Sequence, residues 1–246
     1  MQASDPATDH QDTTLVCIAR VHDHLRGGPH NFSFDRHYAD ATPEASTVVR
    51  HILQAEQAFL TRSAHFMLSQ GIRQFLDLGS GLPTNALTTL SPEATVVHVD
   101  TDPAVVAHGR LLCRNHFLQA DATHLNEVLV PLITAGTLEL HKPIGLLAIG
   151  LPHLLPDTAR ALTFLPSYAK TLAPGSALAL THLTPWFADR LTPAATNLIA
   201  GPGNSLHPRR RRKVAKMFTG FDLVTPGLTT LSQPDTALLA GLGVKP

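Results

Sequence analysis

The sequence predicts an α/β protein with an open, doubly wound sheet, and two features of the chain support this. Five short runs are apolar at nearly every position, and helix-length stretches separate most of them. Such runs suit parallel strands, because helices cover these strands on both faces. Two further strand candidates near the C-terminus predict an antiparallel hairpin at one edge, which brings the expected sheet to seven strands. This Rossmann-like, mostly parallel arrangement implies right-handed crossovers.

The first 45 residues are expected to form a tail and a helical capping segment. Residues 1 to about 14 are polar and predict disorder. The stretch "LVCIARVHDHL" predicts a short helix. "RGGPHNF" predicts a loop, because two glycines and a proline do not fit inside a regular element. Residues 46–246 are then expected to form the main α/β domain, with one structural domain overall.

A long helix is expected from Ser46 to Gly71. Apolar residues recur there every three or four positions, which is the spacing of a helix with one buried face. They are Val49, Ile52, Leu53, Phe59, Leu60, Phe66 and Met67. Gly71 suits the end of this helix, since glycine readily adopts the left-handed conformation that closes many helices.

The strand candidates follow in order as "RQFLDLG", "TVVHVD", "HFLQAD", "IGLLAIG" and "SALALTHL". From about Pro208 the chain predicts a helix, "RRRRKVAKMF", and then the edge strands "FDLVTPGL" and "TALLAGLGV". Five consecutive basic residues would spread around every side of that helix and form no single stripe, so we expect a solvated face. Contact between one arginine and an acidic substrate or carrier protein is the alternative.

Composition indicates a soluble protein that acts on something small. Hydrophobic residues make up 43% of the chain and the formal net charge is zero, so nucleic acid and anionic membranes are not expected partners. The polar start resembles no secretory signal, and no window has eighteen uncharged apolar residues. Cys17 and Cys113 are too few for a disulfide framework or a zinc site, so we expect a cytoplasmic enzyme. A homodimer is left open.

Polar residues and glycines mark the ends of three strands. Gly79 and Gly81 follow the first, where the chain can turn sharply and a ligand can approach without meeting a Cβ. Asp100 ends the second, where a carboxylate can accept both hydroxyls of a ribose, and Asp121 follows the third. Together they predict a slot for a nucleoside. The structural alternative is a tight turn with two capping acids.

A dinucleotide is not expected in this slot. The full fingerprint would place a third glycine at residue 84, which is Thr84. This absence counts against an NAD-dependent dehydrogenase.

Several motifs resemble the class I S-adenosylmethionine-dependent methyltransferases, and specifically the actinobacterial S-adenosyl methyltransferase family, formerly DUF574. They are "ARVHDHLRGGPHNFSFDR", "FLDLGSGLPT", "VVHVDTDPAVVAHGR", "LQAD", "LPHLLPD", "LAPGSALALTHLT", "FDLVTPGL" and "GLGVKP", which span almost the whole chain. The resemblance implies S-adenosylmethionine as cofactor, with Gly79 and Gly81 facing its methionine part, Asp100 its ribose, and Asp121 with Ala122 its adenine. The other cofactor-binding residues expected are Asp77, Ser80, Thr101, Asp102, Gly150, Asn31 and Arg20.

The N-terminal motif departs from the family pattern, which reads roughly Y-D-Y-L-L-G-G-K-D-N-F, whereas this chain has "HDHLRGGPHNF". His22 and His24 replace tyrosines, and both are candidate acid-base groups because imidazole titrates near neutral pH. The alternative is that they are exposed loop residues. A zinc site made of His22, His24, His30 and His37 is disfavoured, because no thiolate helps and the spacing matches no common structural site. No metal is expected.

Glu56 and His153 complete the catalytic candidates. Glu56 lies on the apolar stripe of the long helix, where an isolated charge is costly, so it is expected to hold the cofactor's ammonium or to act as a base. The alternative is that it reaches water at the edge of the stripe. His153 follows the fourth strand and is the strongest candidate for a general base, or else bonds to backbone. His182 is expected to be structural.

Three functions are open at this stage. Methyl transfer to a small molecule of specialised metabolism leads, and it mainly requires alignment of the acceptor. Ring closure of the cofactor's aminocarboxypropyl arm, with release of methylthioadenosine, is the second. A cofactor-binding sensor or scaffold without turnover is the third.

Overall fold

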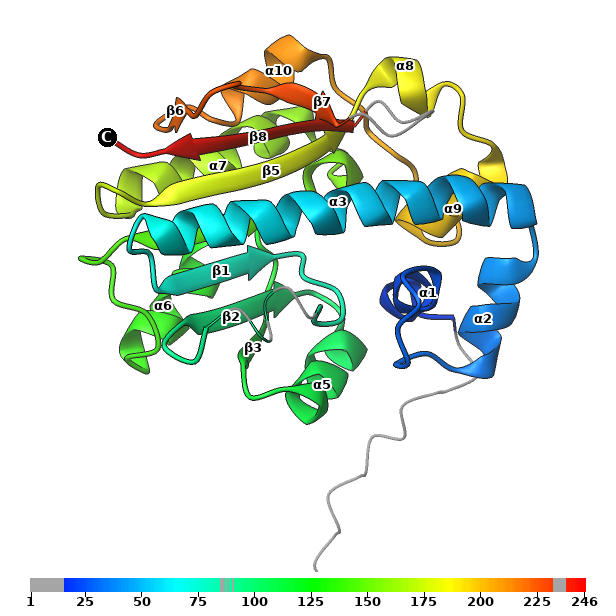
Figure 1. The fold of residues 1–246 in the computed structure, drawn as a ribbon, viewed down its shortest axis with the longest axis horizontal. Coiled ribbons are helices and arrows are strands. Elements are labelled where there is room, and N and C mark those ends of the chain that lie inside the picture. Colours follow the sequence, from blue (N-terminus) through cyan, green and yellow to red (C-terminus); the bar gives the residue numbers. More distant parts are fainter. Residues whose placement is uncertain (1–15, 85–86, 88, 90, 232–237) are drawn as a thin grey trace, which may run out of the picture.

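The computed structural model describes residues 16–84, 87, 89, 91–231 and 238–246. The predicted disorder of residues 1–14 lies outside this part. The described residues form a central sheet with helices on both faces (Figure 1). No helix among them is long and apolar enough to cross a membrane.

The sheet has eight strands in the order β3-β2-β1-β4-β5-β8-β6, with β7 also paired to β8. Strands β1 to β5 pair in parallel, and β8 runs antiparallel to β5, β6 and β7. The bounds are β1 (Gln74–Leu78), β2 (Thr95–Asp100), β3 (His116–Gln119), β4 (Ile144–Ala148), β5 (Ala177–Leu183), β6 (Asp222–Leu223), β7 (Thr229–Leu231) and β8 (Leu238–Val244).

The α/β class and the antiparallel edge are therefore confirmed, with one strand more than expected. Of the run "FDLVTPGL" only Asp222–Leu223 form a strand, β6, and the extra strand β7 (Thr229–Leu231) follows that run. Pro226 and Gly227 lie in a turn between β6 and β7, and proline lacks the N–H that a strand ladder needs. Both short strands pair with β8.

The helices are α1 (Ile18–Leu25), α2 (Ser33–Asp40), α3 (Pro43–Ser69), α5 (Pro103–Leu112), α6 (Leu125–Thr134), α7 (Thr158–Thr171), α8 (Pro185–Ala188), α9 (Pro193–Ala200) and α10 (Arg211–Lys216), with a 3-10 turn η1 (Pro152–Leu154). Helix α3 begins three residues before the expected domain boundary, since Pro43 suits the first helical position. It ends at Ser69, and Gly71 follows two residues later in the left-handed conformation expected of it, with a φ of +83°.

Alternate residues of the strands pack into two apolar layers, one on each face of the sheet. Leu146 packs with α6, α7 and α10 on one face, whereas Leu147 packs with α3 on the other. Both are fully buried, and truncating such a leucine to alanine costs about 2–5 kcal/mol. A third cluster joins α1, α3 and α9. It fixes the N-terminal helices beyond the carboxyl ends of β1 and β2, whose arrowheads point toward α1 (Figure 1).

The helix expected from Pro208 begins later, at Arg211. Arg209 and Arg210 precede it, and Arg210 has extended backbone. The expectation of a solvated face is wrong for Arg209, which is only 4% exposed. Its guanidinium donates to the carbonyl oxygens of Pro152 at 2.8 Å and Leu155 at 2.7 Å.

Candidate functional site

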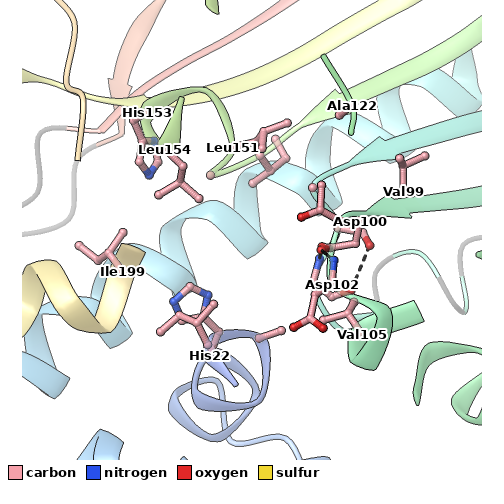
Figure 2. Close-up of a pocket in the computed structure, with 18 of the residues that line it drawn as sticks. His22, Val99, Asp100, Asp102, Val105, Ala122, Leu151, His153, Leu154 and Ile199 are labelled. Atoms are coloured by element: carbon pink, nitrogen blue, oxygen red, sulfur yellow. Dashed lines mark hydrogen bonds between the residues drawn. The ribbon is translucent and has the colours of Figure 1, made fainter. Parts of the chain in front are cut away.

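A cavity of about 420 Å³ lies at the carboxyl ends of the parallel strands, under α1. Sites of this size accommodate small molecules and cofactors. Twelve of the sixteen expected site residues line it: His22, Glu56, Gly79, Ser80, Gly81, Asp100, Thr101, Asp102, Asp121, Ala122, Gly150 and His153. Figure 2 shows two halves. The acidic half carries Asp100 and Asp102, and the imidazole half carries His22, His153, Leu154 and Ile199.

The glycine turn after β1 is tied to the end of β2. The backbone N–H groups of Gly79 and Ser80 donate to the carbonyl of Val99 at 2.8 and 3.1 Å. Gly79 has a φ of +67°, and a Cβ placed there would lie 2.8 Å from the Leu151 side chain. Both the conformation and the close approach require glycine at this position.

Asp100 holds two backbone segments of the acidic half together. Its two oxygens accept the backbone N–H groups of Gly81 at 2.9 Å and Asp102 at 3.0 Å. Burial raises the pKa of Asp100, although these two hydrogen bonds oppose the shift. Each oxygen keeps a further lone pair, so the carboxylate can still accept hydroxyl groups. Asp102 caps α5 by accepting the N–H of Ala104 at 2.8 Å.

Asp121 is also held by the chain itself. Its Oδ1 accepts the Thr123 N–H at 2.8 Å and the Thr123 hydroxyl at 2.6 Å, and its Oδ2 accepts from Arg160 at 3.1 Å. Burial alone would raise the pKa of Asp121. The Thr123 hydrogen bonds and the charges of Arg160 and His124 outweigh burial, so the pKa is lowered.

Glu56 is buried and belongs to a hydrogen-bond chain that links three elements. The Thr181 hydroxyl donates to Oε1 of Glu56 at 2.9 Å and accepts the Gly150 N–H at 2.8 Å. Burial raises the pKa of Glu56, opposed by the Thr181 hydrogen bond and the nearby Arg26 charge. The alternative that Glu56 reaches water is wrong, because its exposed fraction is 5%.

Arg26 lines the cavity and was not among the expected site residues. Its Nε is buried without a hydrogen-bond partner in the described part of the chain. Burial lowers the pKa of Arg26, while the charges of Glu56, Asp23 and Asp77 oppose this. A signal was present in the sequence, since Arg26 occupies a leucine position of the N-terminal motif that also changes at His22 and His24.

His22 presents a neutral imidazole to the cavity. Its Nε2 lies 2.8 Å from the carbonyl oxygen of Leu198 and must donate to it, which leaves Nδ1 as an acceptor. Burial, reinforced by the charge of Arg26, lowers the pKa of His22 to about 4. The ring is therefore uncharged at neutral pH.

His153 is 2% exposed, and its Nδ1 is buried without a partner among the described residues. Burial, then the charges of His182, Arg209 and His22, lower its pKa well below the usual value. His182 lies behind it, with ring centres 5.7 Å apart. The carbonyl of Leu183 and the Nη1 of Arg209 hold the two ring nitrogens of His182.

Four expected residues do not line the cavity, namely Asp77, Asn31, Arg20 and His24. Asp77 hydrogen-bonds to buried His98 at 3.0 Å. Asn31 donates to Asp23, and Arg20 forms a buried ion pair with Asp35, so both hold the capping segment together.

The remaining histidines of the N-terminal motif are spread apart. His24 lies 3.2 Å from the Asp40 carboxylate, His30 packs edge-on against His108, and His37 bonds to the Ser33 carbonyl. Within the described residues, no group of three or more histidine, cysteine or acidic side chains is arranged to hold a metal ion.

Comparison with known proteins gives a family match. A family model described as S-adenosyl methyltransferase matches residues 4–238. A DUF574 family protein from Streptomyces avermitilis is 26% identical, with a TM-score of 0.82 over 96% of this chain and 99% of its own. A candidate methyltransferase from Thermobifida fusca is 30% identical, with a TM-score of 0.78 over 98% of both chains. No curated protein matches in sequence.

More distant structures share the fold. Magnesium protoporphyrin IX methyltransferase from Synechocystis PCC 6803, solved with bound S-adenosylmethionine, is 12% identical with a TM-score of 0.56, over 92% of this chain and 90% of its own.

Proposed function

The chain belongs to the S-adenosyl methyltransferase family, and from this premise we propose that it methylates a small molecule of specialised metabolism in the cytoplasm. The cofactor of the family is S-adenosylmethionine, which supplies a methyl group on a positively charged sulfur. One observation carries the proposal. A single cavity combines an acidic half suited to adenosine with an imidazole half in which Nδ1 of His153 has no partner among the described residues.

The residues of the acidic half fit the adenosine part of the cofactor. The remaining lone pairs of Asp100 are available to the ribose hydroxyls. Ala122 offers an apolar contact beside the adenine, and Asp121 is fixed by Thr123 and Arg160.

Glu56 and Arg26 fit the amino-acid end. They carry opposite charges, line the same cavity, and form no ion pair with each other among the described residues. A zwitterion needs this pattern, with Arg26 facing its carboxylate and Glu56 facing its ammonium. The unpartnered Nε of Arg26 and the buried Glu56 carboxylate would both gain partners.

The imidazole half is suited to the acceptor. Leu154 and Ile199 supply apolar walls, and His22 and His153 are neutral near pH 7. A neutral imidazole can accept a hydrogen bond from an O–H or N–H nucleophile and take its proton. We assign His153 as the base and His22 as a group that orients the acceptor.

Cofactor binding to Arg26 can be tested by calorimetry with two ligands. S-adenosylhomocysteine contains the amino-acid end, whereas methylthioadenosine lacks it. Arg26→Gln is expected to weaken S-adenosylhomocysteine at least tenfold and to leave methylthioadenosine within twofold. Arg62→Gln, at an exposed position of α3, is the matched control. Equal losses for both ligands would contradict the assignment.

Turnover separates the enzyme from a non-catalytic sensor. Small-molecule extracts incubated with the protein and S-adenosylmethionine are expected to yield S-adenosylhomocysteine, detected by mass spectrometry. His153→Gln should lower its rate of formation about 10²-fold or more, as removal of a general base does. Tight cofactor binding with no product from any extract would instead indicate a sensor or scaffold.

Glu56 favours a second candidate, ring closure within the cofactor. A buried carboxylate with a raised pKa could take a proton from the neighbouring ammonium. The freed amine would then form a C–N bond as the C–S bond breaks, and methylthioadenosine would leave. Methylthioadenosine formed from cofactor alone, and lost in Glu56→Gln, would support this candidate. S-adenosylhomocysteine as the sole product would exclude it.

A further inference from the structure

The basic run of the sequence forms a groove of about 780 Å³ beside the loop that carries His153. Arg209, Arg210, Arg212 and Lys213 line it together with His207, and no acidic residue is among its described lining residues. We call this feature the basic groove. The chain as a whole has no net charge, so the concentration of cations here is local.

The late start of α10 brings these side chains together. Had the helix begun at Pro208, five successive residues would point in different directions. Instead Arg209 and Arg210 lie on the preceding segment and Arg212 and Lys213 on the first turn of α10, so four of the five face one groove. Arg211 is absent from the lining residues and donates to the carbonyl of Leu228. The run therefore forms no single stripe on a helix, as expected, but four of its residues share a groove because two of them precede the helix.

Arg209 holds one side of the groove in place through hydrogen bonds. Its Nη atoms donate to Pro152 and Leu155, which belong to the loop that carries His153. Its Nε is buried without a partner among the described residues. The N–H of His207 also donates to the carbonyl of His153 at 2.8 Å. Hydrogen bonds from the groove residues Arg209 and His207 thus reach the loop that carries His153 in the imidazole half of the cavity.

We propose that the basic groove binds the phosphate or diphosphate group of a small-molecule ligand. Guanidinium groups match phosphate oxygens in geometry and charge. The charge of Asp157 acts on Arg209, but no carboxylate is among the described lining residues, so the cations that line the groove repel one another unless an anion joins them. A groove of this volume suits a small molecule, and its cations are gathered in one hollow rather than spread over a flat face. The site does not depend on methyl transfer in the neighbouring cavity.

Calorimetric titration with inorganic pyrophosphate and inorganic phosphate at low salt tests the proposal. The variant is Arg210→Ala/Arg212→Ala/Lys213→Ala, which leaves Arg209 and its loop contacts in place. The control removes the same charge from exposed residues elsewhere, Arg62→Ala/Arg114→Ala/Lys170→Ala. We expect at least tenfold weaker binding in the groove variant and less than twofold in the control. Pyrophosphate binding tighter than phosphate would assign a diphosphate, and equal binding a monophosphate.

Three results would overturn the proposal. The first is absence of pyrophosphate and phosphate binding to the wild type, and the second is equal weakening in both variants. The third is tighter binding of hexaglutamate, which would indicate that the ligand of the groove is an acidic protein.

Trp186 is the chain's only tryptophan and follows Pro185 in the groove wall, so its fluorescence provides a second readout of binding. S-adenosylmethionine titrated into the same preparations tests the proposed function separately. Its binding should be equal in all three proteins.

Discussion

The two halves of the cavity differ in how their polar atoms are satisfied (Figure 2). In the acidic half, Asp100, Asp102 and Asp121 all accept hydrogen bonds from the chain itself. In the imidazole half, Nδ1 of His153 has no partner among the described residues, and Nδ1 of His22 is left as an open acceptor. The acidic half is therefore built before any ligand arrives, whereas the imidazole half still lacks partners.

An unsatisfied buried polar atom costs about 1–3 kcal/mol. Such atoms are rare in native structures, and a catalytic role is one reason for which they are retained. The difference between the halves is the reason why we propose that the acidic half binds the cofactor and the imidazole half binds the acceptor. It also predicts opposite responses to substitution in the two halves.

The largest effect is expected at Asp100, where one side chain holds the glycine turn and faces the proposed ribose position. Asp100→Ala should weaken S-adenosylmethionine at least 100-fold, or about 2.7 kcal/mol, because it removes the ligand contact and releases the Gly81 and Asp102 N–H groups. Calorimetry measures this directly. Asp189→Ala, at an exposed position, should have no effect. An affinity within threefold of the wild type would show that the acidic half is not the adenosine site.

The acidic half could be predicted because its signals are local. Two glycines and an acid after successive strands indicate a ligand turn whatever the rest of the chain does, and Gly79, Gly81, Asp100 and Asp121 all line the cavity. Asp77 has the same local signal but bonds to His98 instead. The side of the sheet on which Asp77 lies depends on how β1 pairs with β2. The pattern of apolar residues does not specify that pairing.

The other half depends on contacts between distant segments. Thr181 bonds to Glu56 across 125 positions of sequence. Its only local signal is a polar residue inside the apolar run "SALALTHL". Arg209 was expected in solvent because the start of α10 was placed too early, and helix boundaries are the least certain part of sequence interpretation.

Acid should destabilise the protein through His182, which lies behind His153, at a higher pH than through Asp121. An unfolded histidine takes its proton near pH 6.5, whereas burial lowers the pKa of folded His182 to about 4. Between these values the unfolded state binds more protons, so the free energy of unfolding falls as the pH falls. The loss from His182 alone is about 2 kcal/mol at pH 5.

Urea unfolding of the wild type and His182→Asn at pH 7 and pH 5 measures this loss. The variant should lose about 2 kcal/mol less than the wild type over the interval. Asp121 contributes nothing in this window, because its lowered pKa retains the charge until the pH is below 3.8. Equal losses in both proteins would show that His182 is protonated in the fold at pH 5.

The smallest expected effect is a change in the free energy of unfolding that has opposite signs in the two halves. His153→Leu replaces a buried imidazole that lacks a partner with an apolar side chain, and it should raise the free energy of unfolding by about 1 kcal/mol. Affinity for S-adenosylmethionine should stay within twofold, since the acidic half is untouched. Asp100→Leu should destabilise the protein, because the N–H groups of Gly81 and Asp102 lose their acceptors. Chemical denaturation of both variants at pH 7 compares the signs. If His153→Leu also lowers stability, the imidazole is satisfied within the fold, and the unpartnered atoms of this half no longer point to an acceptor.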